Sequence, residues 1–332
     1  MLDSSQILVL YEKDEARPSR ILSSLCEPLA YLKSFSMPNS ISAWAHGFSL
    51  TNRIRLHYVT QGEGELVILL HGFPEFWYSW RFQIPVLAHN FKVVVPDLRG
   101  VNDSEKPQNG YDIDTLAQDV VGLIRGLGYQ RAHIVGHDCG GMIAWNIAQQ
   151  FPGVLQSLSL LNAPHPHRRL RDMTENLEQL LKNWQLLAFQ VPGLPELLIR
   201  LNLPDFVKEF FQTQAVRKAA FSNDVLQIYQ AALEKKGAIA SALHYYRHFL
   251  NPQTLISRFS NQSGPIHIPT LVLWGEDDRL MNPKASKGLE RFVKAPFKLK
   301  VIPECGHWIQ QEAPRLVNSE LLNFLQRHPI EA

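Results

Sequence analysis

Short apolar runs recur along the chain and predict the strands of a buried sheet. Runs of this length, without alternating polar residues, are typical of parallel strands that are covered on both faces. Ahead of them, Ile54, Leu56 and Tyr58 alternate with polar residues after the turn signal Thr51-Asn52, which predicts an edge hairpin. The apolar runs occupy residues 66–70, 92–96, 133–135, 158–161, 271–274 and 298–302.

Helical patterns lie between or after these runs. Asp114 is expected to cap a helix whose apolar positions, from Leu116 to Leu127, recur at helical spacing, and Gly128 is expected to stop it. A second pattern of the same period lies near the end of the chain, at residues 316–325. Alternation of strands and helices predicts an α/β fold of the α/β-hydrolase type, with a mostly parallel, doubly wound sheet and right-handed crossovers.

The alternation stops between residues 166 and 258. This stretch is rich in Leu, Gln, Glu, Lys and Phe, and Pro192, Pro195 and Pro204 divide it into several helices. We interpret residues 166–258 as a helical cap, or lid, inserted into a core formed by residues 45–165 and 259–332. A cap would supply pocket walls and exclude water from a site beneath it. The alternative is a helical decoration without a part in the site.

Residues 1–44 differ in composition from the rest and predict an N-terminal extension of uncertain order. A weakly amphipathic patch at residues 21–32 leaves a membrane-surface or partner-binding helix as the alternative. The first residues lack the basic region and apolar core of a secretory signal, and no apolar run is long enough to cross a bilayer. Three cysteines without a CxxC pairing fit a reducing compartment, so we expect a cytoplasmic protein.

The charge balance excludes partners that need a strong field. The chain of 332 residues has 33 basic and 31 acidic residues and a net charge of +2, which gives no support for nucleic acid or anionic membrane as a partner. Cys26, Cys139 and Cys305 form no CxxC pair, which argues against a zinc site or a disulfide framework. The expected partner is a small-molecule substrate, and a monomer and a homodimer remain equally open.

Gly136-His137-Asp138-Cys139-Gly140 follows the third apolar run and precedes a helical pattern. This is the spacing of a nucleophile elbow, in which small residues leave room for a side chain that is lifted above the sheet. An aspartate at the apex attacks carbon to give an ester, which suits an epoxide or a carbon–halogen bond better than acyl transfer. Cys139 is the alternative nucleophile, but that register places His137 where a small residue is needed.

Two further strand ends supply an acid and a base. Asp277 and Asp278 follow one late apolar run, and His307 follows the next. The chain order of nucleophile, acid and histidine is that of α/β-hydrolases. His307 would take a proton from water, and either aspartate, by spacing alone, would orient the imidazole.

His71-Gly72-Phe73 follows the strand predicted at residues 66–70. The backbone N–H groups of Phe73 and Cys139 are expected to form an oxyanion hole for the Asp138 ester. For His71, shaping of this turn is favoured over proton transfer.

The segments at residues 71–81, 97–107, 136–141 and 306–308 resemble the epoxide hydrolase branch of the α/β-hydrolase superfamily, and the resemblance covers roughly residues 46–328. It implies Asp138 as the nucleophile, Asp278 as the acid and His307 as the base. It also implies no cofactor and no metal.

The resemblance further implies two cap tyrosines that hydrogen-bond the epoxide oxygen and help to protonate it. Tyr246 matches the second, whereas Gln185, beside Trp184, stands where the family has the first. An amide donates a hydrogen bond but gives up no proton near neutral pH. The predicted substrate-binding residues are His71, Trp184, Gln185, Tyr245 and Trp308.

Other functions stay open at this point. Cys139 stands where the family commonly has Trp. In haloalkane dehalogenases that indole helps to hold the departing halide, so its absence here counts against haloalkane chemistry. Asn183-Trp184 resembles the His-Trp pair of some haloacetate dehalogenases, so a haloacetate or haloalkane dehalogenase is the second hypothesis. A low-turnover small-molecule receptor is a third, and a serine esterase is disfavoured because the elbow has no serine. Cys139 and Cys305 flank two triad residues, and we expect buried thiols rather than an oxidised pair.

Overall fold

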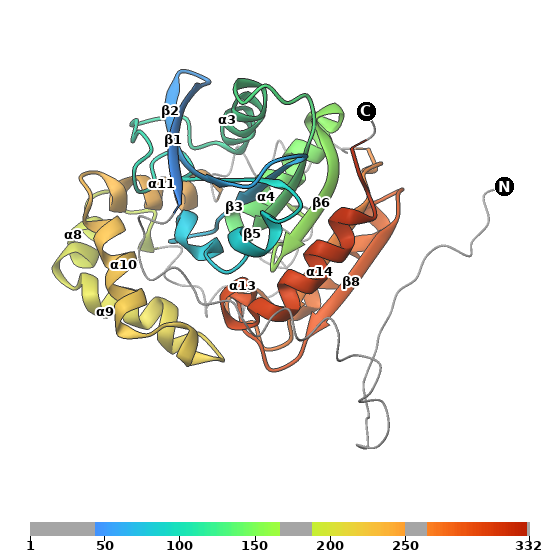
Figure 1. Cartoon of the computed structure of the whole chain (residues 1–332). Coiled ribbons are helices and arrows are strands. Elements are labelled where there is room, and N and C mark those ends of the chain that lie inside the picture. Colours follow the sequence, from blue (N-terminus) through green and yellow to red (C-terminus); the bar gives the residue numbers. More distant parts are fainter. Residues whose placement is uncertain (1–43, 167–187, 250–263, 331–332) are drawn as a thin grey trace, which may run out of the picture.

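A twisted sheet of eight strands forms the centre of the computed structural model, which describes residues 44–166, 188–249 and 264–330 (Figure 1). The strand order is β1-β2-β4-β3-β5-β6-β7-β8, with antiparallel pairing of β1 with β2 and of β2 with β4 and parallel pairing elsewhere. The predicted strands and the edge hairpin are confirmed. The strands are β1 (Ala45–Thr51), β2 (Ile54–Gln61), β3 (Leu66–Leu70), β4 (Lys92–Pro96), β5 (Ala132–His137), β6 (Leu155–Leu161), β7 (Thr270–Gly275) and β8 (Phe297–Ile302).

Alternate residues of the central strands enter two separate cores. Leu66, Ile68 and Leu70 of β3 pack with α3 (Ile113–Gly126) and α4 (Asp138–Gln150) on one face. Val67 and Leu69 of the same strand face the other core, which includes α2 (Ile84–Leu87) and α14 (Pro314–Gln326). Because both faces are covered, the strands need no polar side, and this explains their continuous apolar runs. The predicted α/β fold and the C-terminal helix are confirmed.

The start of α3 differs from the prediction. Asp112, not Asp114, is the N-cap, and its carboxylate accepts from the backbone N–H of Thr115 at 2.9 Å and from the hydroxyl of Thr115 at 2.8 Å. Asp114 lies in the first turn, where it accepts from Asn146 at 2.9 Å. The prediction was wrong because the apolar face begins at Ile113, one turn before the first position that the sequence pattern used.

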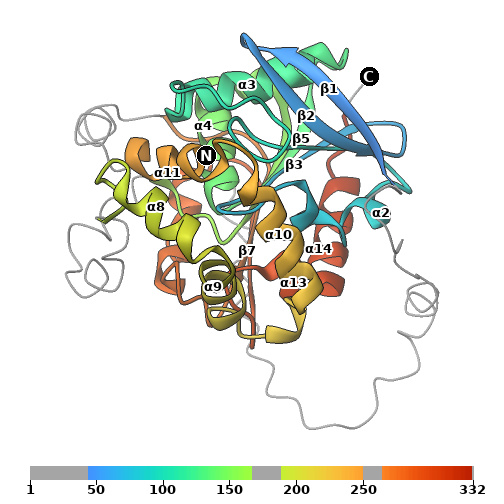
Figure 2. The ribbon, with the colours of Figure 1, turned by 90° about the vertical axis from the view of Figure 1, so that its left-hand side faces the viewer.

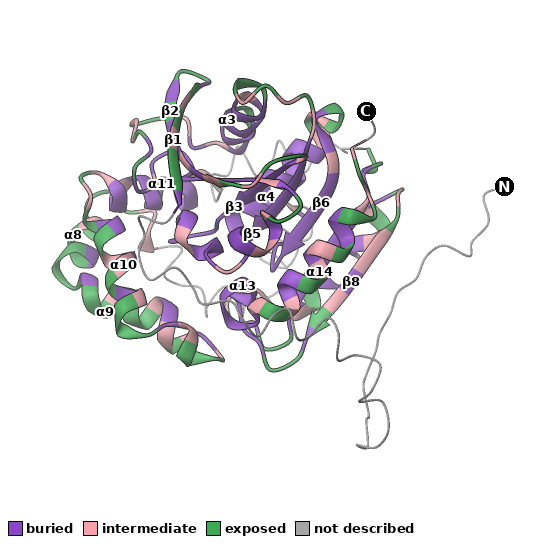
Figure 3. Ribbon diagram, in the orientation of Figure 1, coloured by how far each residue is buried: buried purple, intermediate pink, exposed green. Residues whose placement is uncertain are grey.

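A helical insert between β6 and β7, the cap, covers one end of the sheet (Figure 2). Its described helices are α8 (Leu194–Leu201), α9 (Leu203–Lys208), α10 (Asn223–Glu234) and α11 (Ala238–Phe249). Pro195 and Pro204 stand in the first turns of α8 and α9, where a missing N–H costs nothing. Figure 3 shows that the outer faces of α8 and α9 are exposed, whereas the central strands β3 and β5 are buried.

Some predictions fall outside the described residues. Trp184 and Gln185 lie in residues 167–187, and most of the expected N-terminal extension lies in residues 1–43. Among the helices in the described ranges, none combines the length and the apolar character that a membrane span requires.

Candidate active site

Asp138 stands at a sharp turn from β5 into α4, and glycines make that turn possible. A Cβ atom on Gly136 would lie 2.5 Å from the carbonyl oxygen of Gly140, and one on Gly140 would lie 2.4 Å from that of Leu70. Asp138 has a left-handed backbone with φ of 47°, a conformation that few residues other than glycine adopt. Gly136 and Gly140 therefore leave the room that the predicted elbow needs around Asp138.

The Asp138 carboxylate is buried, with 4% of the residue exposed, and it meets a backbone donor. The N–H of Phe73 donates to Oδ2 across 3.1 Å. Asp138 is also the first residue of the 13-residue helix α4, where the helix dipole favours a negative charge. The N–H of Phe73 thus lies where the predicted oxyanion hole needs a donor. Cys139, the second predicted donor, follows Asp138 in the first turn of α4.

His307 and Asp278 meet above the ends of β7 and β8. Nδ1 of His307 donates to Oδ2 of Asp278 at 2.9 Å. The same carboxylate accepts from Asn162 at 2.5 Å and from the backbone N–H groups of Leu280 and Met281 at 2.8 Å each. These donors fix the Asp278 carboxylate in place. Because Nδ1 of His307 is bonded to it, Nε2 is the nitrogen that can exchange a proton with water.

The structure separates the two aspartates that spacing alone left equivalent. Asp278 is buried and contacts His307, whereas Asp277 is exposed and its N–H bonds to the carbonyl of Cys305 at 3.0 Å. Asp278 is therefore the partner of the imidazole in the described structure.

Three carboxylates set the protonation of His307. Burial works to lower its pKa, but Asp278, Asp138 and Glu75 outweigh that effect and raise the pKa to about 9. The charge of Asp138 therefore contributes to the raised pKa of His307. It follows that the imidazole is mostly protonated at neutral pH while Asp138 is ionised.

A buried network around Glu75 lies behind this pair. Glu75 Oε2 accepts from Nδ1 of His137 at 2.7 Å and from the N–H of Gly72 at 3.0 Å, and Oε1 accepts from Gln310 and Gln311. Burial works to raise the pKa of Glu75, but His137 and these hydrogen bonds leave it below its ordinary value. The second ring nitrogen of His137 faces the backbone carbonyl of His307 at 2.9 Å. Each nitrogen of His137 thus faces an oxygen atom, one from Glu75 and one from the backbone of His307.

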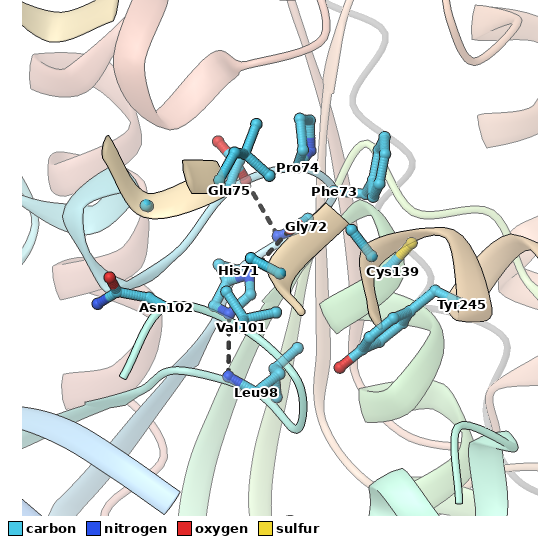
Figure 4. A pocket seen from close by; sticks show the side chains of 14 residues that line it. His71, Gly72, Phe73, Pro74, Glu75, Leu98, Val101, Asn102, Cys139 and Tyr245 are labelled. Atoms are coloured by element: carbon cyan, nitrogen blue, oxygen red, sulfur yellow. Dashed lines mark hydrogen bonds between the residues drawn. The ribbon is translucent and has the colours of Figure 1, made fainter. Parts of the chain in front are cut away.

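A pocket opens beside the elbow, between the core and the cap (Figure 4). Phe73 and Cys139 form its border with the elbow, while Asp138 and His307 are not in its lining. The cap supplies mainly small side chains, and the lining is almost entirely apolar. Its walls are His71–Glu75, Leu98, Val101, Asn102, Cys139, Ala232, Leu233, Ala238, Ala242 and Tyr245.

The neighbouring tyrosines of α11 have different surroundings. Tyr246 packs its ring against that of Phe73, with ring centroids 4.6 Å apart, and so lies near the elbow. Tyr245 lines the pocket, but its hydroxyl donates to the carbonyl of Arg99 at 2.8 Å. Phe73 thus contacts Tyr246 through its ring and Asp138 through its backbone N–H.

His71 and Trp308 occupy structural positions. Nε2 of His71 accepts from the N–H of Leu98 at 3.0 Å, and Nδ1 donates to the carbonyl of Gly72 at 2.8 Å (Figure 4). Burial lowers the pKa of His71, in agreement with a neutral ring that shapes the turn. Trp308 is fully buried against phenylalanines of the cap, including Phe211 and Phe221, rather than in the pocket wall.

The remaining candidates for chemistry have local partners. Cys139 and Cys305 are both buried and neither forms a disulfide in the described residues, and burial raises the pKa of Cys305 to about 12. In the described ranges, His57, Asp97 and Asp103 place possible metal ligands within 4.8 Å of one another. Nδ1 of His57 is bonded to Asp97 at 2.6 Å and Asp103 pairs with Lys235, so this cluster satisfies itself without a metal.

Sequence reasoning missed several residues that organise the site. Glu75 and His137 were noted only as parts of motifs, and Asn162, which holds Asp278, was not noted at all. A signal was present for Asn162, because an amide directly after a buried strand needs a polar partner. Ala232 and Ala242 gave no signal, since alanine is ordinary in a helix.

Comparisons with known proteins identify the family and the fold of the chain. Residues 65–314 match the family model described as alpha/beta hydrolase fold. The chain is 35% identical to epoxide hydrolase 3 of Xenopus tropicalis, over 82% of this chain and 75% of that protein. It is 36% identical to AB hydrolase superfamily protein YfhM of Bacillus subtilis (strain 168), over 84% of this chain and 97% of the relative. A solved variant of Bacillus megaterium epoxide hydrolase, in complex with its naphthyloxypropanediol product, superposes with a TM-score of 0.77 at 32% identity, over 84% of this chain and 100% of the other.

Proposed function

The chain belongs to the epoxide hydrolase family within the α/β-hydrolase fold, and from that membership we propose that it opens an epoxide to a vicinal diol through a covalent ester on Asp138. The observation that carries the proposal is the surroundings of one carboxylate. Asp138 accepts from Phe73 at 3.1 Å, and its charge contributes to the raised pKa of His307.

In the first step, a carboxylate oxygen of Asp138 bonds to a ring carbon of the epoxide. The bond between that carbon and the ring oxygen breaks, and the oxygen keeps the electron pair. The hydroxyl of Tyr246 gives its proton to this oxygen, which leaves an alcohol, an alkyl ester and a phenolate. The placement of Tyr246 against Phe73 supports this role.

In the second step, Nε2 of His307 takes a proton from water and the resulting hydroxide attacks Cγ of Asp138. The backbone N–H groups of Phe73 and Cys139 stabilise the oxyanion, and the bond between Cγ and the alkyl oxygen breaks. The proton held by His307 returns to the phenolate, and the second water proton goes to the departing alkoxide. The balance is epoxide plus water to diol, with all three side chains restored.

The covalent ester is the testable feature. His307→Gln should form the ester but not hydrolyse it, so intact-mass spectrometry should show the protein with one substrate added. Asp138→Asn is the matched control, because it preserves size and removes the nucleophile, and it should keep its unmodified mass. An unmodified His307→Gln protein after incubation with reactive epoxides and haloacids alike would contradict the proposal.

Tyr246→Phe separates the two steps. Loss of the hydroxyl should slow formation of the ester by roughly 10²-fold or more, while the ester that does form is hydrolysed without accumulating. Tyr245→Phe is the neighbouring comparison, because it removes a hydroxyl that is bonded to Arg99 and should lower stability first. A Tyr246→Phe protein with an unchanged rate of ester formation would remove Tyr246 from the mechanism.

A substrate panel distinguishes epoxide hydrolysis from the other readings. Styrene-type, fatty-acid-type and small aliphatic epoxides should yield diols, whereas fluoroacetate and chloroacetate should release little halide. Halide release without diol formation would favour the dehalogenase alternative. Saturable binding of a small molecule with neither product would favour a receptor.

A further inference from the structure

Glu312, the last residue of α13 (Ile309–Glu312), lies buried beneath the cap and collects backbone donors from two separate segments. Oε2 accepts from Gly306 at 3.1 Å and from two cap residues, Val216 at 3.0 Å and Arg217 at 2.9 Å. Oε1 accepts from Trp308 at 3.3 Å. One carboxylate therefore joins the cap to the peptide groups on both sides of His307.

Arg217 reaches back from the cap to the same loop. Its guanidinium donates to the backbone carbonyls of Glu304 at 2.9 Å, Glu312 at 3.3 Å and Pro303 at 3.4 Å. These residues surround the loop between β8 and α13 that carries His307. Figure 2 shows α13 next to the cap helices. The core and the cap thus contact each other through two side chains. The Glu312 carboxylate of the core accepts from cap N–H groups, and the Arg217 guanidinium of the cap donates to core carbonyls.

The glycine before His307 gives the carboxylate its room. A Cβ atom on Gly306 would lie 2.8 Å from Oε1 of Glu312 and 3.3 Å from a methyl carbon of Val216. A larger residue would push the carboxylate and the cap segment away together. The placement of Glu312 is therefore matched to the Gly-His-Trp sequence of the catalytic loop.

We propose that Glu312 and Arg217 form a clasp that seats the cap on the loop of His307 and sets the position of that imidazole for hydrolysis of the alkyl ester. The proposal rests on the function proposed above. Neither side chain touches the reacting atoms, so both are positioning residues. Since His307 acts only in the second step, the clasp should govern hydrolysis of the ester and leave its formation nearly unchanged.

Glu312→Gln tests the clasp with little change in size, because the amide turns an N–H₂ group toward N–H donors that need an acceptor. Rapid quenching followed by intact-mass spectrometry would measure the two steps separately. Ester hydrolysis should slow roughly 10- to 100-fold, ester formation should stay within about threefold of the unaltered protein, and the ester should accumulate at steady state. A normal burst of ester formation in the same experiment shows that the variant is folded.

Two further variants complete the design. Arg217→Lys keeps the charge but cannot span several carbonyls, and it should slow hydrolysis in the same sense but less. This variant carries the test if Glu312→Gln does not fold. Glu320→Gln is the matched control, because that carboxylate pairs with Lys298 and Lys300 away from the loop and its loss should leave the ratio of the two rates unchanged.

The outcomes separate this proposal from the one it rests on. If Glu312→Gln and Arg217→Lys slow both steps equally, or change neither, the clasp is overturned. If His307→Gln yields no covalent adduct, the proposed function fails. If that adduct forms while the Glu312 and Arg217 variants keep the normal ratio of rates, only the clasp fails.

Discussion

His137 donates from Nε2 to the backbone carbonyl of His307 across 2.9 Å, so the residue before Asp138 holds the main chain of the proposed base. The other ring nitrogen meets the buried carboxylate of Glu75 at 2.7 Å. The turn of Asp138, the loop after β3 and the loop of His307 are therefore joined by one imidazole. Movement of any of these segments would disturb the other two.

Removal of this imidazole should be costly for stability. His137→Phe leaves the buried Glu75 carboxylate without the imidazole that it contacts, and we expect the free energy of unfolding to fall by about 3–5 kcal/mol. Urea denaturation would measure it. Combining His137→Phe with Glu75→Gln should recover part of the loss, because the buried charge is then absent. Additive losses in this double-variant cycle would show that the two side chains are not coupled.

The adjacent aspartates 277 and 278 provide a matched pair. Asp278→Asn should reduce turnover roughly 10⁴-fold, because the amide favours the wrong tautomer of His307. The ester on Asp138 should accumulate. Asp277→Asn changes an exposed carboxylate and should retain normal turnover. Steady-state rates together with intact masses check this, and a large loss in the Asp277 variant instead would reassign the acid.

The raised pKa of His307 predicts a pH dependence of ester hydrolysis. Ester formation neutralises Asp138, one of the anions that hold this pKa at about 9. The pKa of the imidazole should therefore fall in the covalent intermediate. Single-turnover hydrolysis should rise with pH as the imidazole loses its proton, with an apparent pKa below about 9. A midpoint at or above that value would show that Asp138 does not influence the base.

The same shift predicts a change in stability. The pKa of His307 is raised on folding from its ordinary value of 6.5 to about 9, so its protonation stabilises the folded chain. This contribution is complete below pH 6.5 and is lost as the pH rises through about 9. Urea denaturation across that range should show a falling free energy of unfolding, and His307→Gln should show a smaller fall. An equal fall in both proteins would assign the effect to other groups.

The small cap residues should set the size of the substrate. Ala242 of α11 faces the pocket, and Ala242→Phe would fill part of its apolar space. We expect kcat/KM for styrene-type and fatty-acid-type epoxides to fall by roughly tenfold or more, while a small aliphatic epoxide is affected less. Gln227→Phe, on the exposed face of α10, is the control. Equal losses for large and small epoxides would mean that the pocket does not hold the substituent.

The sheet and the elbow were predictable from the sequence because their causes are local. Strands buried on both faces give unbroken apolar runs, and the elbow needs Gly136 and Gly140 beside a nucleophile. The cap of α3 was harder, since Asp112 and Asp114 both suit a helix start and only packing of Ile113 distinguishes them.

The supporting network was not predictable because its members are distant in the chain. Glu75 bonds to His137 across 62 positions and to Gln311 across 236. Tyr245 and Tyr246 are adjacent, yet the helix turns one hydroxyl toward Arg99 and places the other ring against Phe73. No pattern in a single sequence reports such contacts.

The left-handed backbone conformation of Asp138 implies that its proposed role as nucleophile and the thermal stability of the chain are opposed at this position. A residue other than glycine at φ of 47° costs about 1–3 kcal/mol relative to relaxed geometry, and glycine escapes that cost. A chain with glycine at 138 should thus be inert yet melt at a higher temperature. A screen for thermal stability alone would therefore favour glycine at this position and lose the carboxylate.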